Sequence, residues 1–209
     1  MQIEVKGLGK KYNKQWVFRH LDYKFDSNAS YAITGPNGSG KSTLLQILTG
    51  FFPPSEGTIS YKRPNSEVIK EDDFYNHLDI VTPYLELIEE FTLQEFIEFH
   101  FKFKKIKVGL SLDEVVYKMY LDEDRSKLIG NFSSGMKQRL KLGIAFFSQS
   151  PICFLDEPSS NLDKKGVAWY LDNVKEAIND KLVIISSNQA HEYYFCDHVL
   201  NIPDFKKIK

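Results

Sequence analysis

The chain of 209 residues contains few cysteines and no long apolar run. Its two cysteines, Cys153 and Cys196, lack the neighbouring Cys or His residues of a metal or redox site, so we expect reduced thiols in or near the core. No apolar run approaches the roughly 18 residues of a membrane-spanning helix, and residues 1–6 lack the apolar segment of a signal peptide. These absences argue against a disulfide scaffold and a membrane-embedded chain, and they favour a cytoplasmic protein.

An excess of charge of one sign is also missing, since 27 basic residues accompany 28 acidic ones. This balance provides no general attraction to nucleic acid or to an anionic membrane. Residues 99–105 interleave phenylalanines with lysines and could stack on bases. We favour the simpler interpretation, a helix end with aromatic core contacts and solvated lysines, and we expect no nucleic-acid partner.

The rest of the composition is typical of a globular protein, with 42% hydrophobic and 26% charged residues. Apolar patterns of period two and of period 3.6 predict alternating strands and helices. The predicted strands are residues 3–5, 17–25, 31–34, 57–61, 78–82, 151–155, 182–185 and 199–202, and the predicted helices start near residues 43, 112, 136 and 167. Residues 9–16 read as turn-prone and residues 62–76 as a polar surface excursion. We expect a single α/β domain whose core, residues 1–85 and 148–209, carries an inserted, mainly helical lobe, residues 86–147.

The clearest motif is Gly-Pro-Asn-Gly-Ser-Gly-Lys-Ser-Thr at residues 35–43, which fits G-x-x-x-x-G-K-[ST]. Small residues let backbone N–H groups turn inward around phosphates, Lys41 can reach the β- and γ-phosphates, and the Ser42 hydroxyl can bind Mg²⁺. A predicted strand precedes the motif and a predicted helix follows, which argues against a chance glycine-rich turn. The predicted phosphate-binding residues are Gly35, Pro36, Asn37, Gly38, Ser39, Gly40, Lys41, Ser42 and Thr43.

A second motif is the apolar run at residues 152–155, which ends in two carboxylates, Asp156 and Glu157. A buried strand with this ending places Asp156 at the carboxyl edge of a sheet, where it can hold Mg²⁺. Glu157 can then act as general base on the attacking water. Taken alone, the motif could also be a strand followed by an acidic turn.

A third motif is Phe-Ser-Ser-Gly-Met-Lys-Gln at residues 132–138, directly before a predicted helix. Ser133 and Gly135 at a helix N-terminus can bind an anion, although the same residues would also form an ordinary helix cap. The order and spacing of the three motifs favour the anion site.

With these motifs in this order, the sequence resembles the ATP-binding cassette (ABC) ATPases, the nucleotide-binding subunits of ABC transporters, over nearly its whole length. Residues 132–138 match the family signature, usually Leu-Ser-Gly-Gly-Gln, with substitutions at Ser134 and Met136, and residues 160–163 resemble the D-loop. Tyr12 matches the aromatic residue that stacks on adenine, and Trp16 is the weaker alternative. The resemblance implies a P-loop NTPase core with a mixed sheet.

The resemblance also implies a mechanism and partners. Two cassettes pair head to tail, as a homodimer or, alternatively, a heterodimer, and each ATP with its Mg²⁺ lies between the P-loop of one and residues 133–135 of the other. ATP binding closes the pair and hydrolysis through Glu157 reopens it. A separate transmembrane permease would convert this motion into transport, with export favoured, and would hold the cassette at the cytoplasmic face of the membrane.

Two positions depart from the family pattern. Asn188 stands where the family usually has a histidine that contacts the γ-phosphate, and Tyr84 stands where a glutamine is expected. Asparagine can donate a hydrogen bond but cannot carry a positive charge. Because Lys41 and Glu157 are present, we expect a slow ATPase in which Asn188 or Gln189 supplies the missing donor. The alternatives are a nucleotide-sensing module with weak or no hydrolysis, and a soluble ABC protein of ribosomes or DNA, which usually has two cassettes or long insertions.

Overall fold

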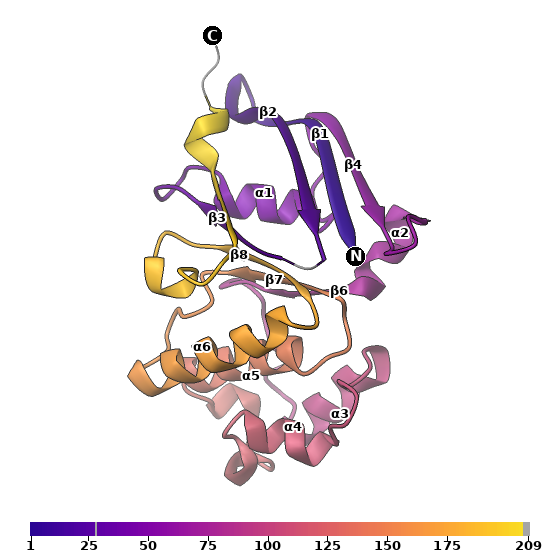
Figure 1. Ribbon diagram of the computed structural model, residues 1–209. Helices are drawn as coiled ribbons and strands as arrows, with labels where there is room; N and C mark the ends of the chain where they lie inside the picture. Colours follow the sequence, from indigo (N-terminus) through magenta and orange to yellow (C-terminus); the bar gives the residue numbers. More distant parts are fainter. Residues whose placement is uncertain (28, 207–209) are drawn as a thin grey trace.

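The computed structural model describes residues 1–27 and 29–206, and its strands form two sheets stacked on either side of helix α1 (Figure 1). The upper sheet is antiparallel, in the order β2-β1-β4-β5. Its strands are β1 (Gln2–Tyr12), β2 (Gln15–Asp26), β4 (Glu56–Lys62) and β5 (Val68–Ile69). The lower sheet is parallel, in the order β6-β7-β8-β3-β9. Its strands are β3 (Ser30–Thr34), β6 (Leu78–Val81), β7 (Ile152–Asp156), β8 (Leu182–Ser186) and β9 (His198–Asn201).

Helices cover the other face of the parallel sheet (Figure 1). The longer helices are α1 (Lys41–Leu48), α3 (Leu93–Phe103), α4 (Leu112–Lys118), α5 (Ser134–Phe146) and α6 (Lys164–Ile178). Short helical turns are α2 (Glu71–Phe74), η1 (Tyr75–His77), η2 (Asp122–Asp124), η3 (Ile129–Asn131), η4 (Ala190–Glu192) and η5 (Ile202–Phe205). Within the described ranges, no helix is both long enough and apolar enough to cross a membrane.

The parallel sheet divides the hydrophobic core in two. Along β7, Ile152 and Phe154 belong to the cluster shared with α1 and the antiparallel sheet. Cys153 and Leu155 belong to the cluster between the parallel sheet and the helices that cover its other face. This alternation follows from the two-residue period of a strand. Because both faces are buried, the central strands read as unbroken apolar runs, as the sequence predicts for residues 152–155 and 182–185.

The helical side is held by close packing between the two predicted apolar helix faces. A side chain at Gly143 of α5 would place its Cβ 2.3 Å from the sulfur of Met119, which follows α4, so only glycine allows this approach. Met119 is fully buried, as are Val115 and Val116 of α4. The helix faces predicted around residues 112–119 and 136–147 therefore meet each other. Whether residues 86–147 form a separate lobe stays a prediction.

The predicted α/β class is confirmed, and the antiparallel and parallel strand pairs lie in two separate sheets instead of one mixed sheet. Two local interpretations were wrong. Residues 9–16 are not mainly a turn, because β1 continues to Tyr12 through irregular pairing and only two residues separate it from β2. Residues 62–76 are not a free excursion, because Ile69 and Phe74 are buried and the Phe74 ring stacks on Tyr61. Because Ile69 and Phe74 are isolated in a long polar segment, the sequence shows no periodic apolar pattern that would predict their burial.

The interpretation of residues 99–105 holds only in part. Lys102 and Lys105 are exposed, as expected. Phe103, however, is 73% exposed instead of packing in the core, and Lys104 is largely buried. Its ammonium donates hydrogen bonds to the carbonyl oxygens of Tyr75 (2.9 Å) and Leu78 (2.7 Å), and burial lowers its pKa. The expected reduced cysteines are confirmed as free thiols, and burial raises the pKa of both Cys153 and Cys196 to about 12.

Candidate nucleotide site

The loop between β3 and α1 has the backbone that the predicted phosphate motif requires. Gly35 and Gly40 have φ angles of 143° and 109°, in the left-handed region that favours glycine. A Cβ at Gly40 would also lie 2.2 Å from a methyl group of Val17, so the close approach of β2 excludes larger residues there. Helix α1 starts at Lys41, one residue later, and its first N–H groups have no partners within the helix. The loop and the first turn of α1 therefore leave backbone N–H donors available to an anion.

Lys41 bends back over this loop. Its ammonium lies 3.0 Å from the carbonyl oxygen of Gly35 and 3.4 Å from that of Pro36, and the residue is only 5% exposed. The Ser39 N–H donates to the Pro36 carbonyl oxygen at 3.0 Å and tightens the turn. Among the described residues Lys41 has no carboxylate partner, so its ammonium is available to an anion in front of the loop.

A cavity of about 480 Å³ opens in front of the loop. The residues that line it are Tyr12, Val17, Asn37, Gly38, Gly40, Lys41, Ser42, Thr43, Tyr84 and Glu157. Tyr12 is half exposed, so its ring is available to a flat ligand. Trp16 does not line the cavity; the Arg19 guanidinium lies 4.4 Å from the centre of its ring. The structure therefore supports Tyr12 as the stacking candidate.

The two predicted carboxylates lie at the carboxyl edge of the parallel sheet. Asp156 is the last residue of β7 and is 4% exposed, and among the described residues none offers a hydrogen-bond partner to its Oδ1 atom. Mg²⁺ is commonly held by one or two protein oxygens together with substrate phosphates. The unpartnered carboxylate oxygen of Asp156, with the Ser42 hydroxyl in the cavity, fits such an ion.

Glu157 follows in an unusual conformation, with a φ of 46° that is rare for a non-glycine residue. Its N–H donates to the Ser186 carbonyl oxygen of β8 at 2.9 Å, which fixes the turn and leaves the side chain at the cavity. Backbone strain of this kind often marks a functional position.

Asn188 also reaches the phosphate loop. Its amide nitrogen donates to Oδ1 of Asn37 at 2.8 Å, although the two residues are far apart in the sequence. Asn188 follows β8, the strand that pairs with both β3 and β7. The topology thus brings the loop after β3, the acids after β7 and Asn188 to one edge.

The signature residues lie elsewhere. Ser133 caps α5, accepting a hydrogen bond from the Met136 N–H at 3.2 Å, and its own side chain is exposed. In the part of the chain that the structure describes, neither Ser133 nor Gly135 lines the cavity. A Cβ at Gly135 would lie 3.1 Å from the Asn161 carbonyl oxygen, so the signature touches the D-loop instead.

One residue near the carboxyl edge of the parallel sheet, Glu192, was not predicted from the sequence. It is fully buried and accepts a hydrogen bond from the Ser159 N–H at 2.7 Å. No motif marks it, because it lies in a short 3₁₀ turn without apolar periodicity. From the sequence alone, a single acidic residue outside any motif is expected to be exposed at the surface.

The sheet order, the glycine loop and the paired acids together define a P-loop nucleoside triphosphatase. The family model for ABC transporters matches residues 18–160. An uncharacterized ABC transporter ATP-binding protein of Bacillus subtilis, YybJ, is 31% identical over 96% of this chain and 92% of its own length. The bacitracin export ATP-binding protein BceA of Halalkalibacterium halodurans is 27% identical over 95% and 82%.

The fold agrees with solved cassettes. A dimeric ATP-binding cassette, in a post-hydrolysis state bound to ADP and Pi, superposes with a TM-score of 0.80 at 21% identity, over 95% of this chain and 93% of that one. The family model and the relative YybJ together show that the chain belongs to the ABC transporter family. The prediction of an ABC transporter ATP-binding subunit is confirmed.

Proposed function

We propose that this chain binds MgATP in the cavity beside Lys41 and hydrolyses it as one half of a head-to-tail cassette pair. The phosphates would lie on the N-terminus of α1 and against the Lys41 ammonium, with the adenine ring on Tyr12. Asp156 and the Ser42 hydroxyl would hold Mg²⁺, which neutralises phosphate charge when bound. The convergence of Lys41, Asp156 and Glu157 at one sheet edge carries this proposal.

The protein groups divide the chemistry between them. The Glu157 carboxylate takes a proton from the attacking water, and its strained turn keeps it at the cavity. Lys41 and the α1 N–H groups stabilise charge on the phosphoryl oxygens. Asn188, whose amide donates to Asn37 in the phosphate loop, would add one neutral donor to the phosphate oxygens. A neutral donor stabilises this charge less than a cation, so we expect slow turnover.

A second cassette would complete the site. Ser133 and Gly135 offer donors at a helix N-terminus, yet neither residue lines the cavity of its own chain. Pairing with a second copy would bring these donors onto the γ-phosphate bound by the partner. The contact of Gly135 with Asn161 would place the D-loop at the same interface.

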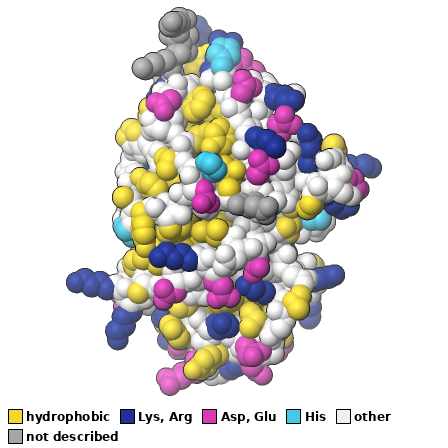
Figure 2. Space-filling view, in the orientation of Figure 1, with side chains coloured by type: hydrophobic (Ala, Val, Ile, Leu, Met, Phe, Trp, Pro, Cys, Tyr) yellow, Lys and Arg dark blue, Asp and Glu magenta, His cyan; other side chains and the backbone are white. Residues whose placement is uncertain are grey.

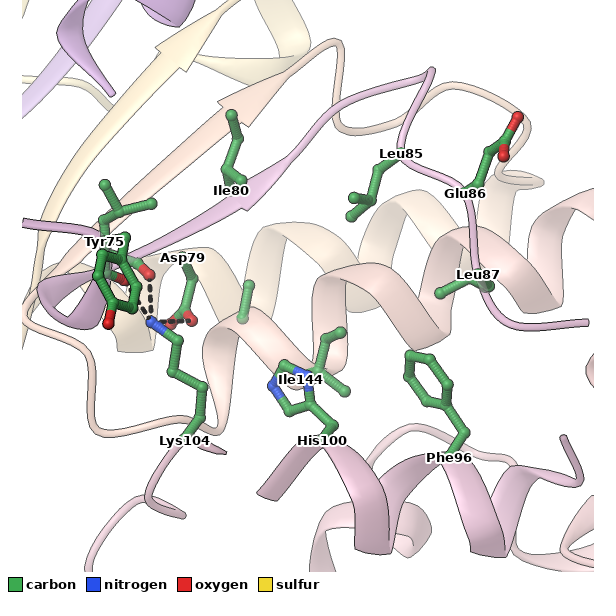
Figure 3. Close-up of a pocket in the computed structure, with 12 residues that line it drawn as sticks. Tyr75, Asp79, Ile80, Leu85, Glu86, Leu87, Phe96, His100, Lys104 and Ile144 are labelled. Carbon is green, nitrogen blue, oxygen red and sulfur yellow. Dashed lines mark hydrogen bonds and ion pairs between the residues drawn. The ribbon is translucent and has the colours of Figure 1, made fainter. Parts of the chain in front are cut away.

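A membrane partner is proposed for a different cavity, which holds about 300 Å³ (Figure 3). Leu85, Glu86 and Leu87 form one wall of it, and α3 forms another with Phe96 and His100. Tyr84, the residue just before this wall, lines the nucleotide cavity. Residues 84–87 thus line both cavities, so a change at the nucleotide could shift the wall of the second cavity and be passed on to a permease.

The chemistry of this groove suits a mainly apolar partner segment with few charges. Burial lowers the pKa of His100 and of Lys104, with Asp79 partly opposing both shifts, so the His100 ring tends to stay neutral. Beyond the groove, the face of the molecule drawn in Figure 2 carries basic and acidic side chains mixed together, in line with the balanced charge of the sequence. Because Leu87 lines the groove, a charge introduced by Leu87→Asp should stop the cassette from copurifying with its permease while leaving ATP binding intact.

We further propose a position at the cytoplasmic face of the membrane and transport in the export direction. The relative BceA is named for bacitracin export, which supports this direction. Substrate uptake by inverted vesicles that contain the complex would support export, and uptake only by right-side-out vesicles would contradict it.

Steady-state phosphate release tests the proposed hydrolysis most simply. Glu157→Gln should reduce the turnover number by roughly 10²–10⁴-fold, the usual contribution of a general base. Glu123→Gln, at an exposed glutamate of η2, is the matched control and should behave like the parent. Equal turnover in the parent and Glu157→Gln would reject the role of Glu157 and favour the nucleotide-sensing alternative.

A further inference from the structure

Glu192 is a fully buried carboxylate behind the nucleotide site, in the turn between β8 and β9. A buried charge is costly unless donors surround it. The donors that Glu192 receives come from two different loops, the one after β7 and the one after β8. The position of this acid therefore links two segments that the proposed mechanism uses.

One carboxylate oxygen, Oε2, fixes the loop that bears Asn188. The Ser187 hydroxyl donates to it, and the same hydroxyl oxygen accepts the Gln189 N–H at 2.9 Å. The Ser187 N–H donates to the Ile33 carbonyl oxygen of β3 at 3.1 Å. Asn188 is thus held between two anchored neighbours, next to the phosphate loop.

The other oxygen, Oε1, fixes the loop that follows Glu157. It accepts the Ser159 N–H at 2.7 Å and the Ser159 hydroxyl, and the His191 ring nitrogen lies 3.0 Å from that hydroxyl oxygen. The Ser159 carbonyl oxygen in turn accepts the Leu162 N–H at 3.0 Å. Glu192 therefore anchors the start of the D-loop.

We infer that Glu192 is a positioning residue for ATP hydrolysis, and that its carboxylate holds the Asn188 loop and the loop after Glu157 in one fixed arrangement. This rests on the roles proposed above for Glu157 and Asn188. A carboxylate accepts at both oxygens, whereas an amide donates at one end, so only an acid satisfies hydroxyl and N–H donors on both sides. A shift of residues 158–163 against a second cassette would reach Asn188 through this bridge.

Glu192→Gln tests the bridge with little change of shape. The amide can accept from Ser159 while its NH₂ faces Ser187, which weakens the Asn188 arm first. We expect the turnover number to fall roughly 3- to 30-fold, the range typical of coupled networks, with the KM for ATP within twofold of the parent. In an Asn188→Ala background the same substitution should cost less, because one of its two targets is already gone.

Tyr170→Phe is the matched control. The Tyr170 hydroxyl is equally buried and donates to the backbone carbonyl oxygen of Glu192 at 2.8 Å, without touching the carboxylate. Both variants should lower the melting temperature, but only Glu192→Gln should lower turnover. If Glu192→Gln turns over within twofold of the parent, or if Tyr170→Phe loses as much, Glu192 is merely structural and the inference is wrong.

Hydrogen exchange separates this inference from the proposed hydrolysis. In Glu192→Gln the amides of residues 157–163 and 186–190 should both exchange faster, while Tyr170→Phe should leave both unchanged. Faster exchange in neither segment would overturn the bridge whatever the activity. Should Glu192→Gln fail to fold, Ser159→Ala and Ser187→Ala each remove one hydroxyl donor. Each should then accelerate exchange in both segments, and acceleration in its own loop alone would contradict the coupling.

Discussion

The phosphate loop and the signature segment both end in the N-terminus of a helix, yet they differ in what surrounds them. At α1 the loop encloses its own donors, and Lys41 is buried against loop carbonyls. At α5 the donors are exposed, capped only by Ser133. We call the loop of residues 35–43 the cradle and, under the proposed pairing of two cassettes, residues 133–135 the half-site. The same local motif therefore predicts binding within the chain at α1 and binding across a pair at α5.

The largest effect is expected from Lys41→Ala, which removes the finished cradle. Loss of a charged hydrogen-bond donor to phosphate should weaken ATP binding by roughly 100-fold. Lys14→Ala, at an exposed lysine in the turn between β1 and β2, should leave binding unchanged. Titration with a fluorescent ATP analogue measures both. Binding by Lys41→Ala at parental affinity would remove the basis of the comparison.

A smaller but more selective effect is expected at the half-site. Ser133→Ala and Ser111→Ala each remove a helix cap whose hydroxyl accepts an N–H at 3.2 Å, and Ser111 also donates to the Glu114 carboxylate. Both should cost about 1 kcal/mol of unfolding free energy. Only Ser133→Ala should also weaken ATP-driven dimerisation, by roughly tenfold, while ATP binding to the monomer stays intact. Equal dimerisation of the two variants in analytical ultracentrifugation would make Ser133 an ordinary cap.

The smallest expected effect concerns the link between the cradle and Asn188. Asn188→His restores a side chain that can carry charge beside Asn37, so the turnover number should rise about fivefold with little change in ATP affinity. The measurement is phosphate release by the isolated cassette and by its complex with the permease. A fall in turnover would mean that the Asn188 contact with Asn37 is itself required.

Much of this arrangement could be predicted from sequence because its signals are local. The glycines of residues 35–40 predict the phosphate loop, and the apolar runs of β7 and β8 predict buried strands, each from neighbouring residues alone. The contact of Asn188 with Asn37 could not be predicted, since it depends on β8 lying beside β3. Likewise, the burial of Phe74 could not be predicted, because it depends on stacking against Tyr61 of β4. Interactions set by sheet order leave no periodic trace.

Nucleotide-dependent pairing tests the central claim, that the chain carries one cradle and one half-site, most directly. Glu157→Gln should bind ATP without hydrolysing it and should sediment as a dimer with MgATP and as a monomer with MgADP or no nucleotide. Adding Ser133→Ala should return it to the monomer at the same ATP occupancy. A Glu157→Gln protein that stays monomeric at saturating MgATP, both alone and with its permease, would contradict the claim.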